Sequence, residues 1–224
     1  MFDAIAPRYD FLNHLLSAGI DRVWRTRAIR SLALTGRETV LDLCTGTGDL
    51  AIEATQAAHG AARVVGIDFS SAMLLLGLHK LRKRGLARHI TLIRGDASRI
   101  PMAATTVDAV TIAFGIRNVE DRGAACREML RVLKSGGRIA ILEFSMPTSP
   151  IVRRLYLSYF RHILPRLGAW ISGHSTAYTY LPDSVDAFRP DDFMDLLRKS
   201  GFVDVAGDPM TFGSVFLYTA RRGS

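Results

Sequence analysis

Residues 39–49 read Thr-Val-Leu-Asp-Leu-Cys-Thr-Gly-Thr-Gly-Asp, an apolar run that ends in two closely spaced glycines. The apolar residues predict a buried strand, and the residues after the glycines predict the start of a helix. Gly46 and Gly48 let the backbone pass close to a ligand, while free N–H groups at the helix start point into the same space. This stretch therefore predicts a strand, a turn and a helix that hold a nucleoside-bearing cofactor.

The glycine spacing alone does not identify the cofactor, because with Ala51 and Asp68 it also fits the dinucleotide fingerprint. Two acids favour S-adenosylmethionine. Asp42 at the end of the first strand would repel a pyrophosphate but attract the ammonium group of a methionine moiety, and Asp96 ends a third predicted strand. Acidic ends on three strands suit a ligand that carries an ammonium group, a ribose diol and an adenine amine. A turn shaped only for packing is the alternative.

Predicted strands and helices alternate along the rest of the chain. After the first strand we expect strands at 63–68, 90–95, 107–114 and 138–144, helices at 48–58, 70–84, 120–134 and 190–200, and a final antiparallel hairpin of 202–206 and 214–220 turned at 207–209. Alternating elements form a doubly wound parallel sheet with right-handed crossovers and a ligand at the carboxyl ends of its strands. The predicted fold class is α/β, a Rossmann-like seven-stranded sheet with an antiparallel last strand, as in class I methyltransferases.

One domain accounts for all 224 residues. Within it we expect an N-terminal helical lid at 1–36, a cofactor-binding core at 37–146, a substrate or lid insertion at 147–189, and a closing helix and hairpin at 190–224. For the N-terminal helices, ordinary packing on the sheet is the alternative to a lid.

Composition argues against several classes of protein. No apolar stretch reaches the roughly 20 residues that cross a bilayer, and the N-terminus lacks the order of a signal peptide. Cys44 and Cys126 are too few for a disulfide framework and are expected to be small buried residues. No cluster has metal-ligand spacing, so we expect no metal. These features predict a cytoplasmic protein and leave open a peripheral contact with the inner face of the membrane.

The formal net charge of +8 at pH 7 comes from basic clusters at 22–30, 80–88 and 153–166. Such clusters are usually solvated helix faces, but they also suit nucleic acid or an anionic membrane. Enzymes that methylate the amino groups of bases usually carry an Asn/Asp-Pro-Pro-aromatic run after strand four, where residues 114–118 read Phe-Gly-Ile-Arg-Asn. We therefore expect no nucleic-acid partner. A non-catalytic protein that keeps only the fold is disfavoured, since the acids and glycines are all present.

Over nearly its whole length the sequence resembles the ubiquinone/menaquinone biosynthesis C-methyltransferases, class I enzymes that use S-adenosylmethionine. The resemblance rests on the motifs at 2–10, 42–50, 114–119, 131–137, 142–145 and 178–184. Of these, Phe-Gly-Ile-Arg-Asn and Tyr-x-Tyr-Leu are the most specific. The resemblance implies C-methylation of a polyprenylated hydroquinone, either demethylmenaquinol or 2-methoxy-6-polyprenyl-1,4-benzoquinol. Another small aromatic substrate is the alternative, and a homodimer is left open.

The resemblance also implies cofactor contacts at Thr47, Asp68, Asp96 and Ala97. Ala113 departs from the family pattern, which often has a serine that touches the cofactor at this position, so only a backbone contact can remain. Combined with the turn argument, the expected cofactor-binding residues are Asp42, Gly46, Thr47, Gly48, Asp68, Asp96 and Ala97.

Methyl transfer to an aromatic carbon needs an electron-rich ring, which a hydroquinone becomes when a hydroxyl loses its proton. A phenol with a pKa near ~10 is mostly protonated at neutral pH. Arg117, after strand four, is the expected catalytic residue, because its cation would lower the pKa of the hydroxyl and order a water that takes the proton. An ion pair of this arginine with Glu120 or Asp121 is the structural alternative.

The expected substrate-binding residues are Asn118, Tyr178 and Tyr180. The asparagine would orient Arg117 or the substrate. The tyrosines, two apart, share one face of an extended segment and suit stacking on a flat ring, with core packing as the alternative. The amphipathic segment 150–172 carries basic and aromatic residues and is the expected membrane-docking surface, although packing on the sheet explains its periodicity equally well.

Overall fold

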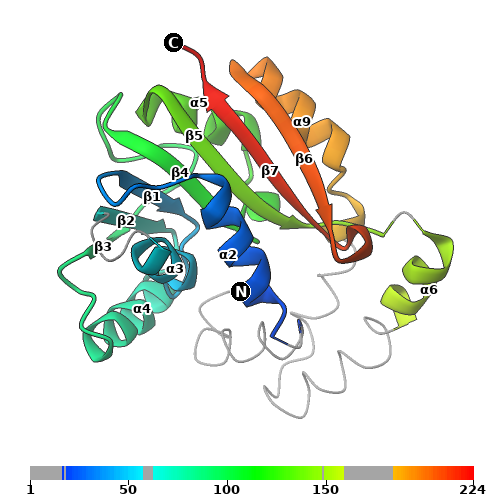
Figure 1. Cartoon of the computed structure of the whole chain (residues 1–224), viewed down its shortest axis with the longest axis horizontal. Helices are drawn as coiled ribbons and strands as arrows, with labels where there is room; N and C mark the ends of the chain where they lie inside the picture. Colours follow the sequence, from blue (N-terminus) through cyan, green and yellow to red (C-terminus); the bar gives the residue numbers. More distant parts are fainter. Residues whose placement is uncertain (1–16, 18, 58–62, 148, 159–183) are drawn as a thin grey trace.

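The computed structural model describes residues 17, 19–57, 63–147, 149–158 and 184–224. Its centre is a seven-stranded sheet in the order β3-β2-β1-β4-β5-β7-β6 (Figure 1). The strands are β1 Thr39–Leu43, β2 Arg63–Asp68, β3 Ile90–Arg94, β4 Val107–Ala113, β5 Leu133–Phe144, β6 Phe202–Met210 and β7 Val215–Arg222. Strands β1 to β5 pair in parallel and β7 pairs antiparallel to β5, which confirms the predicted α/β fold with its antiparallel last strand.

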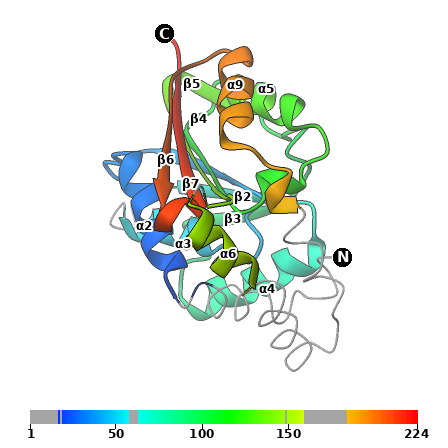
Figure 2. The same cartoon turned by 90° about the vertical axis from the view of Figure 1, so that its right-hand side faces the viewer.

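Helices cover both faces of the sheet (Figures 1 and 2). One face carries α2 Asp21–Ser31, α3 Asp49–Ala57 and α4 Ser71–Lys83, and the other carries α5 Arg122–Val132 and α9 Pro190–Lys199. Each layer buries its own cluster of apolar side chains against the strands, which explains why β4 is mostly apolar. Helix α6, Pro150–Ser158, lies beyond the carboxyl end of β5, and none of the helices in the described ranges has the length and apolar content to cross a bilayer.

Local signals placed the ends of α4 correctly. The hydroxyl of Ser70 accepts a hydrogen bond from the backbone N–H of Met73 at 3.2 Å, and Gly85 follows the helix with a φ of 70°. A serine that caps the first N–H groups is typical of a helix start, and a glycine with positive φ is typical of a helix end.

The predicted hairpin turn at 207–209 is wrong. Gly207, Asp208 and Pro209 lie inside β6, and the connection to β7 is the short helix η3, Thr211–Gly213. Proline is tolerated here because β6 is the edge strand of the sheet, where one row of N–H groups needs no partner. The pairing of β6 with β7 therefore overrides the local turn signal.

The boundary between α5 and β5 also differs from the prediction. Leu133 already pairs with Val107, after which the ladder shifts and resumes with Arg138 opposite Ala109. Gly136, with a φ of 71°, lies in this irregular stretch. Gly136 and Gly137, which lie between the predicted helix at 120–134 and the predicted strand at 138–144, are thus part of an irregularity within β5.

Candidate active site

The glycine turn after β1 is closed by its own backbone. The N–H of Thr45 donates to the carbonyl of Ile67 on β2 at 3.1 Å, and the N–H of Gly48 donates to the carbonyl of Thr45 at 2.8 Å. Gly46 and Gly48 have φ values of 57° and 85°, a region that disfavours residues with a side chain. The turn therefore has the strand-turn-helix shape that the sequence predicts, and α3 begins directly after it at Asp49.

Asp42 lies below this turn with 1% of its surface exposed. Its two carboxylate oxygens accept hydrogen bonds from the hydroxyls of Thr45 at 2.5 Å and Thr111 at 2.8 Å. Burial raises the pKa of Asp42 to about 6, an effect that these two hydrogen bonds only partly offset. The carboxylate therefore holds the turn onto β1 and β4, and it also borders the cavity described below.

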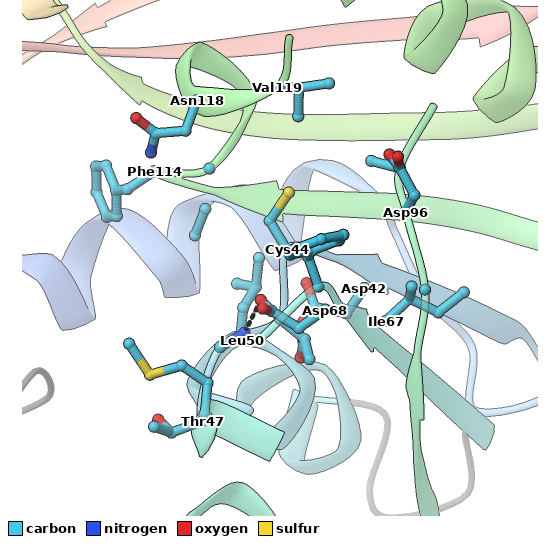
Figure 3. Close-up of a pocket in the computed structure, with 18 of the residues that line it drawn as sticks. Asp42, Cys44, Thr47, Leu50, Ile67, Asp68, Asp96, Phe114, Asn118 and Val119 are labelled. Carbon is cyan, nitrogen blue, oxygen red and sulfur yellow. Dashed lines mark hydrogen bonds between the residues drawn. The ribbon is translucent and has the colours of Figure 1, made fainter. Parts of the chain in front are cut away.

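Asp68 at the end of β2 also contacts the turn. One of its oxygens accepts a hydrogen bond from the N–H of Gly46 at 2.8 Å, and the other accepts one from the N–H of Ser70 at 2.8 Å. Figure 3 shows Asp68 and Cys44 between Asp96 on one side and Phe114 and Asn118 on the other. The acid thus lies at the middle of the site.

A cavity of about 460 Å³ opens at the carboxyl ends of β1, β2 and β4. Of the expected site residues, those that line it are Asp42, Gly46, Thr47, Asp68, Asp96, Ala97 and Asn118. Gly48 shapes the turn without lining the cavity, and Arg117 does not line it either. Tyr178 and Tyr180 lie outside the described residues. Strands far apart in sequence therefore bring the predicted acids together in one place.

Thr47 and Asp49 are held by a cation from α4. The ammonium group of Lys80 lies 2.7 Å from the hydroxyl of Thr47 and 2.7 Å from a carboxylate oxygen of Asp49. The other oxygen of Asp49 lies 3.2 Å from Arg25 of α2. This network fixes the start of α3 between α2 and α4.

At the end of β3 the carboxylate of Asp96 is exposed, and one of its oxygens accepts hydrogen bonds from the N–H and the hydroxyl of Ser98, both at 2.8 Å. Next to it, Ala97 is 7% exposed and forms part of the cavity wall. The second oxygen of Asp96 makes no hydrogen bond within the described ranges, so it remains available to an amine.

Several lining residues were missed by the sequence analysis, above all Arg25, Phe69, Met73 and Val119. Phe69 follows Asp68 directly, and its ring is 71% exposed although it borders the cavity. An aromatic residue directly after an acidic strand end was a usable signal in the sequence for a ring-binding position. The distance of Arg25 in sequence from the turn left no comparable signal.

Arg117 is held by Glu143 of β5, which is fully buried. A guanidinium nitrogen lies 2.5 Å from the carboxylate and also donates to the carbonyl of Phe114 at 2.8 Å. The guanidinium carbon lies 5.4 Å from the ring centre of Phe144. The structural alternative, an ion pair of Arg117 with a nearby acid, therefore occurs with Glu143 of β5 and not with Glu120 or Asp121.

Two residues at strand ends beside the cavity have left-handed backbone conformations: Cys44 with a φ of 52° and Phe114 with a φ of 60°. Such conformations cost energy in non-glycine residues and cluster at functional sites. Gly115 lies against Cys44 so closely that an added Cβ would be 2.3 Å from the cysteine Cβ. The ends of β1 and β4 therefore interlock at this point.

The ring of Phe114 belongs to an aromatic cluster. It stacks on Phe144 with ring centres 4.3 Å apart, and Trp24 of α2 packs edge-on against both rings at 6.0 and 6.4 Å. The indole N–H of Trp24 donates to the hydroxyl of Thr211 at 2.9 Å. One wall of the cavity is therefore an apolar, aromatic surface that α2 supports.

Both cysteines are unpaired thiols, and burial raises the pKa of each; for Cys126 the value is about 12. A thiol with such a pKa stays protonated at neutral pH and is a poor nucleophile. Cys126 is buried as expected, whereas Cys44 is half-buried and lines the cavity. In the described parts of the chain, no group of three or more His, Cys, Asp or Glu side chains is placed to hold a metal ion.

Comparison with known proteins identifies the family. A protein of Syntrophotalea carbinolica named ubiquinone/menaquinone biosynthesis C-methyltransferase UbiE is 50% identical over 99% of this chain and 92% of its own length. The demethylmenaquinone methyltransferase of Bacteroides fragilis is 40% identical over 99% and 91%. A crystal structure of a SAM-dependent methyltransferase from Aquifex aeolicus has a TM-score of 0.66 at 19% identity, covering 88% of each chain, and shares the fold. The model of the ubiE/COQ5 methyltransferase family matches residues 1–222, and this chain belongs to that family.

Proposed function

We propose that this enzyme transfers the methyl group of S-adenosylmethionine to a ring carbon of a polyprenylated hydroquinone, with demethylmenaquinol as the preferred substrate. The observation that carries the proposal is the row of acids Asp42, Asp68 and Asp96, which border one cavity in a chain of the ubiE/COQ5 family. One relative is named as a ubiquinone/menaquinone biosynthesis C-methyltransferase and another as a demethylmenaquinone methyltransferase, and the second name supports the naphthoquinol. The benzoquinol of ubiquinone synthesis is the second substrate to be tested.

The cavity fits this cofactor by its donors and acceptors. Asp68, one oxygen of which binds the glycine turn and the other the N–H of Ser70, suits the ribose diol, and the exposed carboxylate of Asp96 suits the adenine amine. The exposed ring of Phe69 offers a flat apolar surface for adenine. The cofactor supplies a methyl group activated by a sulfonium charge, and acids that line the cavity favour that charge.

The aromatic wall suits the quinol ring. Phe114 borders the cavity, and its stack with Phe144 makes a rigid surface on which a flat ring can pack. The side-chain amide of Asn118 also lines the cavity and makes no hydrogen bond with any described residue, so it is free to contact a quinol oxygen.

Arg117 remains the proposed source of phenolate stabilisation. Glu143 neutralises much of its charge, but the Nε–H of the guanidinium is buried and has no hydrogen-bond partner in the described ranges. A buried N–H donor without a partner is costly. Arg117 lies behind the present cavity lining, so the proposal requires the bound quinol to reach past that lining for a phenolate oxygen to satisfy this donor. The ion pair would then hold the guanidinium in place while that donor acts.

A direct assay tests the proposal. Purified enzyme receives labelled S-adenosylmethionine and either a short-chain demethylmenaquinol or a short-chain 2-methoxy-6-polyprenyl-benzoquinol under reducing conditions. We expect label in the ring of the naphthoquinol, at a kcat/KM at least about tenfold above that for the benzoquinol. The oxidised quinone serves as the control, because without a phenolic hydroxyl the ring is not a carbon nucleophile. Transfer to neither quinol, with binding of the methyl donor intact, would contradict the proposed substrate class.

A further inference from the structure

Arg25 is the one cation among the described residues that line the cavity. The acids that line it are Asp42, Asp49, Asp68, Asp96, Glu120 and Asp121. S-adenosylmethionine carries two positive groups, a sulfonium and an ammonium, and one negative group, a carboxylate. The acids suit the positive groups, whereas the carboxylate would be repelled unless a cation or N–H donors met it.

The guanidinium of Arg25 is built into the site. The residue lies on α2 and is 8% exposed. Its Nη1 atom lies 2.9 Å from a carboxylate oxygen of Asp21 and 3.2 Å from one of Asp49. Its Nε atom is buried and has no hydrogen-bond partner in the described part of the chain. Nη1 donates a hydrogen bond to Asp49 and forms an ion pair with Asp21, so both contacts use the same nitrogen. The edge formed by Nε and Nη2 keeps its donors, and such an edge can bind a carboxylate through two parallel hydrogen bonds.

The position of Arg25 matches the order of groups along the cofactor. Strands β3, β2 and β1 are neighbours, so Asp96, Asp68 and the glycine turn follow each other along the edge of the sheet. With adenine at Asp96 and ribose at Asp68, the methionine moiety lies at the glycine turn. Asp49, the partner of Arg25, is the first residue of α3 directly after that turn.

We infer that Arg25 binds the carboxylate of the methionine moiety of the cofactor. The inference rests on the proposed use of S-adenosylmethionine and assigns a contact that the sequence did not predict. Asp21 and Asp49 orient the guanidinium, and the ligand completes its hydrogen bonding. The competing explanation is that Arg25 only joins α2 to α3. In that case, replacing Arg25 would not change how much the carboxylate of the ligand contributes to binding.

A matched pair of ligands separates these explanations. S-adenosylhomocysteine and its decarboxylated analogue differ only in the carboxylate, and titration calorimetry gives the affinity of each. We expect wild-type protein to bind S-adenosylhomocysteine about 10- to 100-fold more tightly, the range for a hydrogen-bonded charge pair. In Arg25→Met this preference should fall to within about threefold, while affinity for the decarboxylated analogue stays the same.

Arg22→Met is the control, because Arg22 is exposed on the same helix and the change removes the same charge. It should keep the full preference. Arg25→Lys retains a charge between Asp21 and Asp49 but loses the planar fork of the guanidinium. This variant should fold and lose most of the preference for S-adenosylhomocysteine. It therefore tests the inference if Arg25→Met does not fold. An unchanged preference in the folded Arg25 variant, or no preference in wild type, overturns the inference. If wild type binds neither ligand, the proposed cofactor itself is wrong.

Discussion

Arg117 and Glu143 form a buried ion pair in which the guanidinium lies 2.5 Å from the carboxylate, with side chains 8% and 0% exposed. The pair connects the end of β5 to the turn after β4, because the same guanidinium nitrogen also binds the carbonyl of Phe114. It therefore supports both the shape of the aromatic wall and the cation proposed to stabilise a phenolate. These two roles can be separated by experiment.

Removing one partner of this pair should destabilise the fold. Arg117→Ala leaves the carboxylate of Glu143 buried and unpaired, which costs about 3–5 kcal/mol in free energy of unfolding. Replacing both residues, Arg117→Ala with Glu143→Ala, should recover part of that loss because no charge is left buried. Urea unfolding measures the stability of each variant. Turnover should stay low in the double variant, and wild-type turnover there would refute a catalytic role for Arg117.

Asp68 should control affinity for the methyl donor. Asp68→Asn keeps the shape of the side chain but removes the charge and one acceptor for the ribose diol, so we expect binding to weaken about 10- to 100-fold by calorimetry. Asp195→Asn, an exposed change on α9 far from the cavity, is the control and should leave affinity unchanged. Undiminished affinity in Asp68→Asn would place the ribose elsewhere.

Binding of the cofactor should depend on pH through Asp42. Burial raises the pKa of this acid to about 6, so the carboxylate takes up a proton as the pH falls below that value. The ammonium group of the ligand stays protonated between pH 5 and 7, because α-amino groups titrate near pKa ~8. A neutral Asp42 attracts it less, and affinity should be about tenfold weaker at pH 5 than at pH 7.

Asp42→Asn is the control for this dependence. The amide cannot ionise, so affinity in the variant should be low at both pH values and nearly independent of pH. A variant whose affinity still falls toward pH 5 as steeply as that of wild type would assign the titration to another group.

The contact between Gly115 and Cys44 predicts a rescue experiment. Gly115→Ala puts a methyl group 2.3 Å from the Cβ of Cys44, which the turn can accept only by shifting. We expect a loss of about 1–3 kcal/mol in stability. Cys44→Gly removes the clashing atoms and relieves a φ of 52°, so the double variant should be more stable than Gly115→Ala alone. Additive losses in a double-mutant cycle would show that the two residues do not conflict.

Helix α6 is the described part of the proposed membrane-docking segment. Ile151 is 74% exposed and Arg154 is exposed, while Arg153 lies 3.1 Å from Asp186. If this helix meets the membrane, Arg154→Glu should weaken sedimentation with anionic vesicles, and added salt should weaken it further. Arg198→Glu on α9 changes the same charge away from α6 and should have no effect. Wild-type protein that stays in the supernatant at low salt would rule out docking.

The sequence by itself determined the strands, the glycine turn and the acids at the strand ends. These features are encoded within a few residues: the apolar runs specify β1 and β2, and glycine at 46 and 48 permits the backbone that the turn needs. Because the strands are parallel, acids that end them must meet at one edge of the sheet. Asp42, Asp68 and Asp96 could therefore be placed together from the sequence alone.

Only the tertiary structure decided the contacts between distant segments. Arg117 bonds Glu143, which is 26 residues away in sequence, and Arg25 enters the cavity from a helix that precedes the glycine turn. The turn between β6 and β7 likewise depends on pairing with a partner strand, which outweighs the local signal of Gly207 and Pro209. Local patterns reveal the conformation of a segment, but the partner of a charged side chain or of an edge strand is set by which elements pack together.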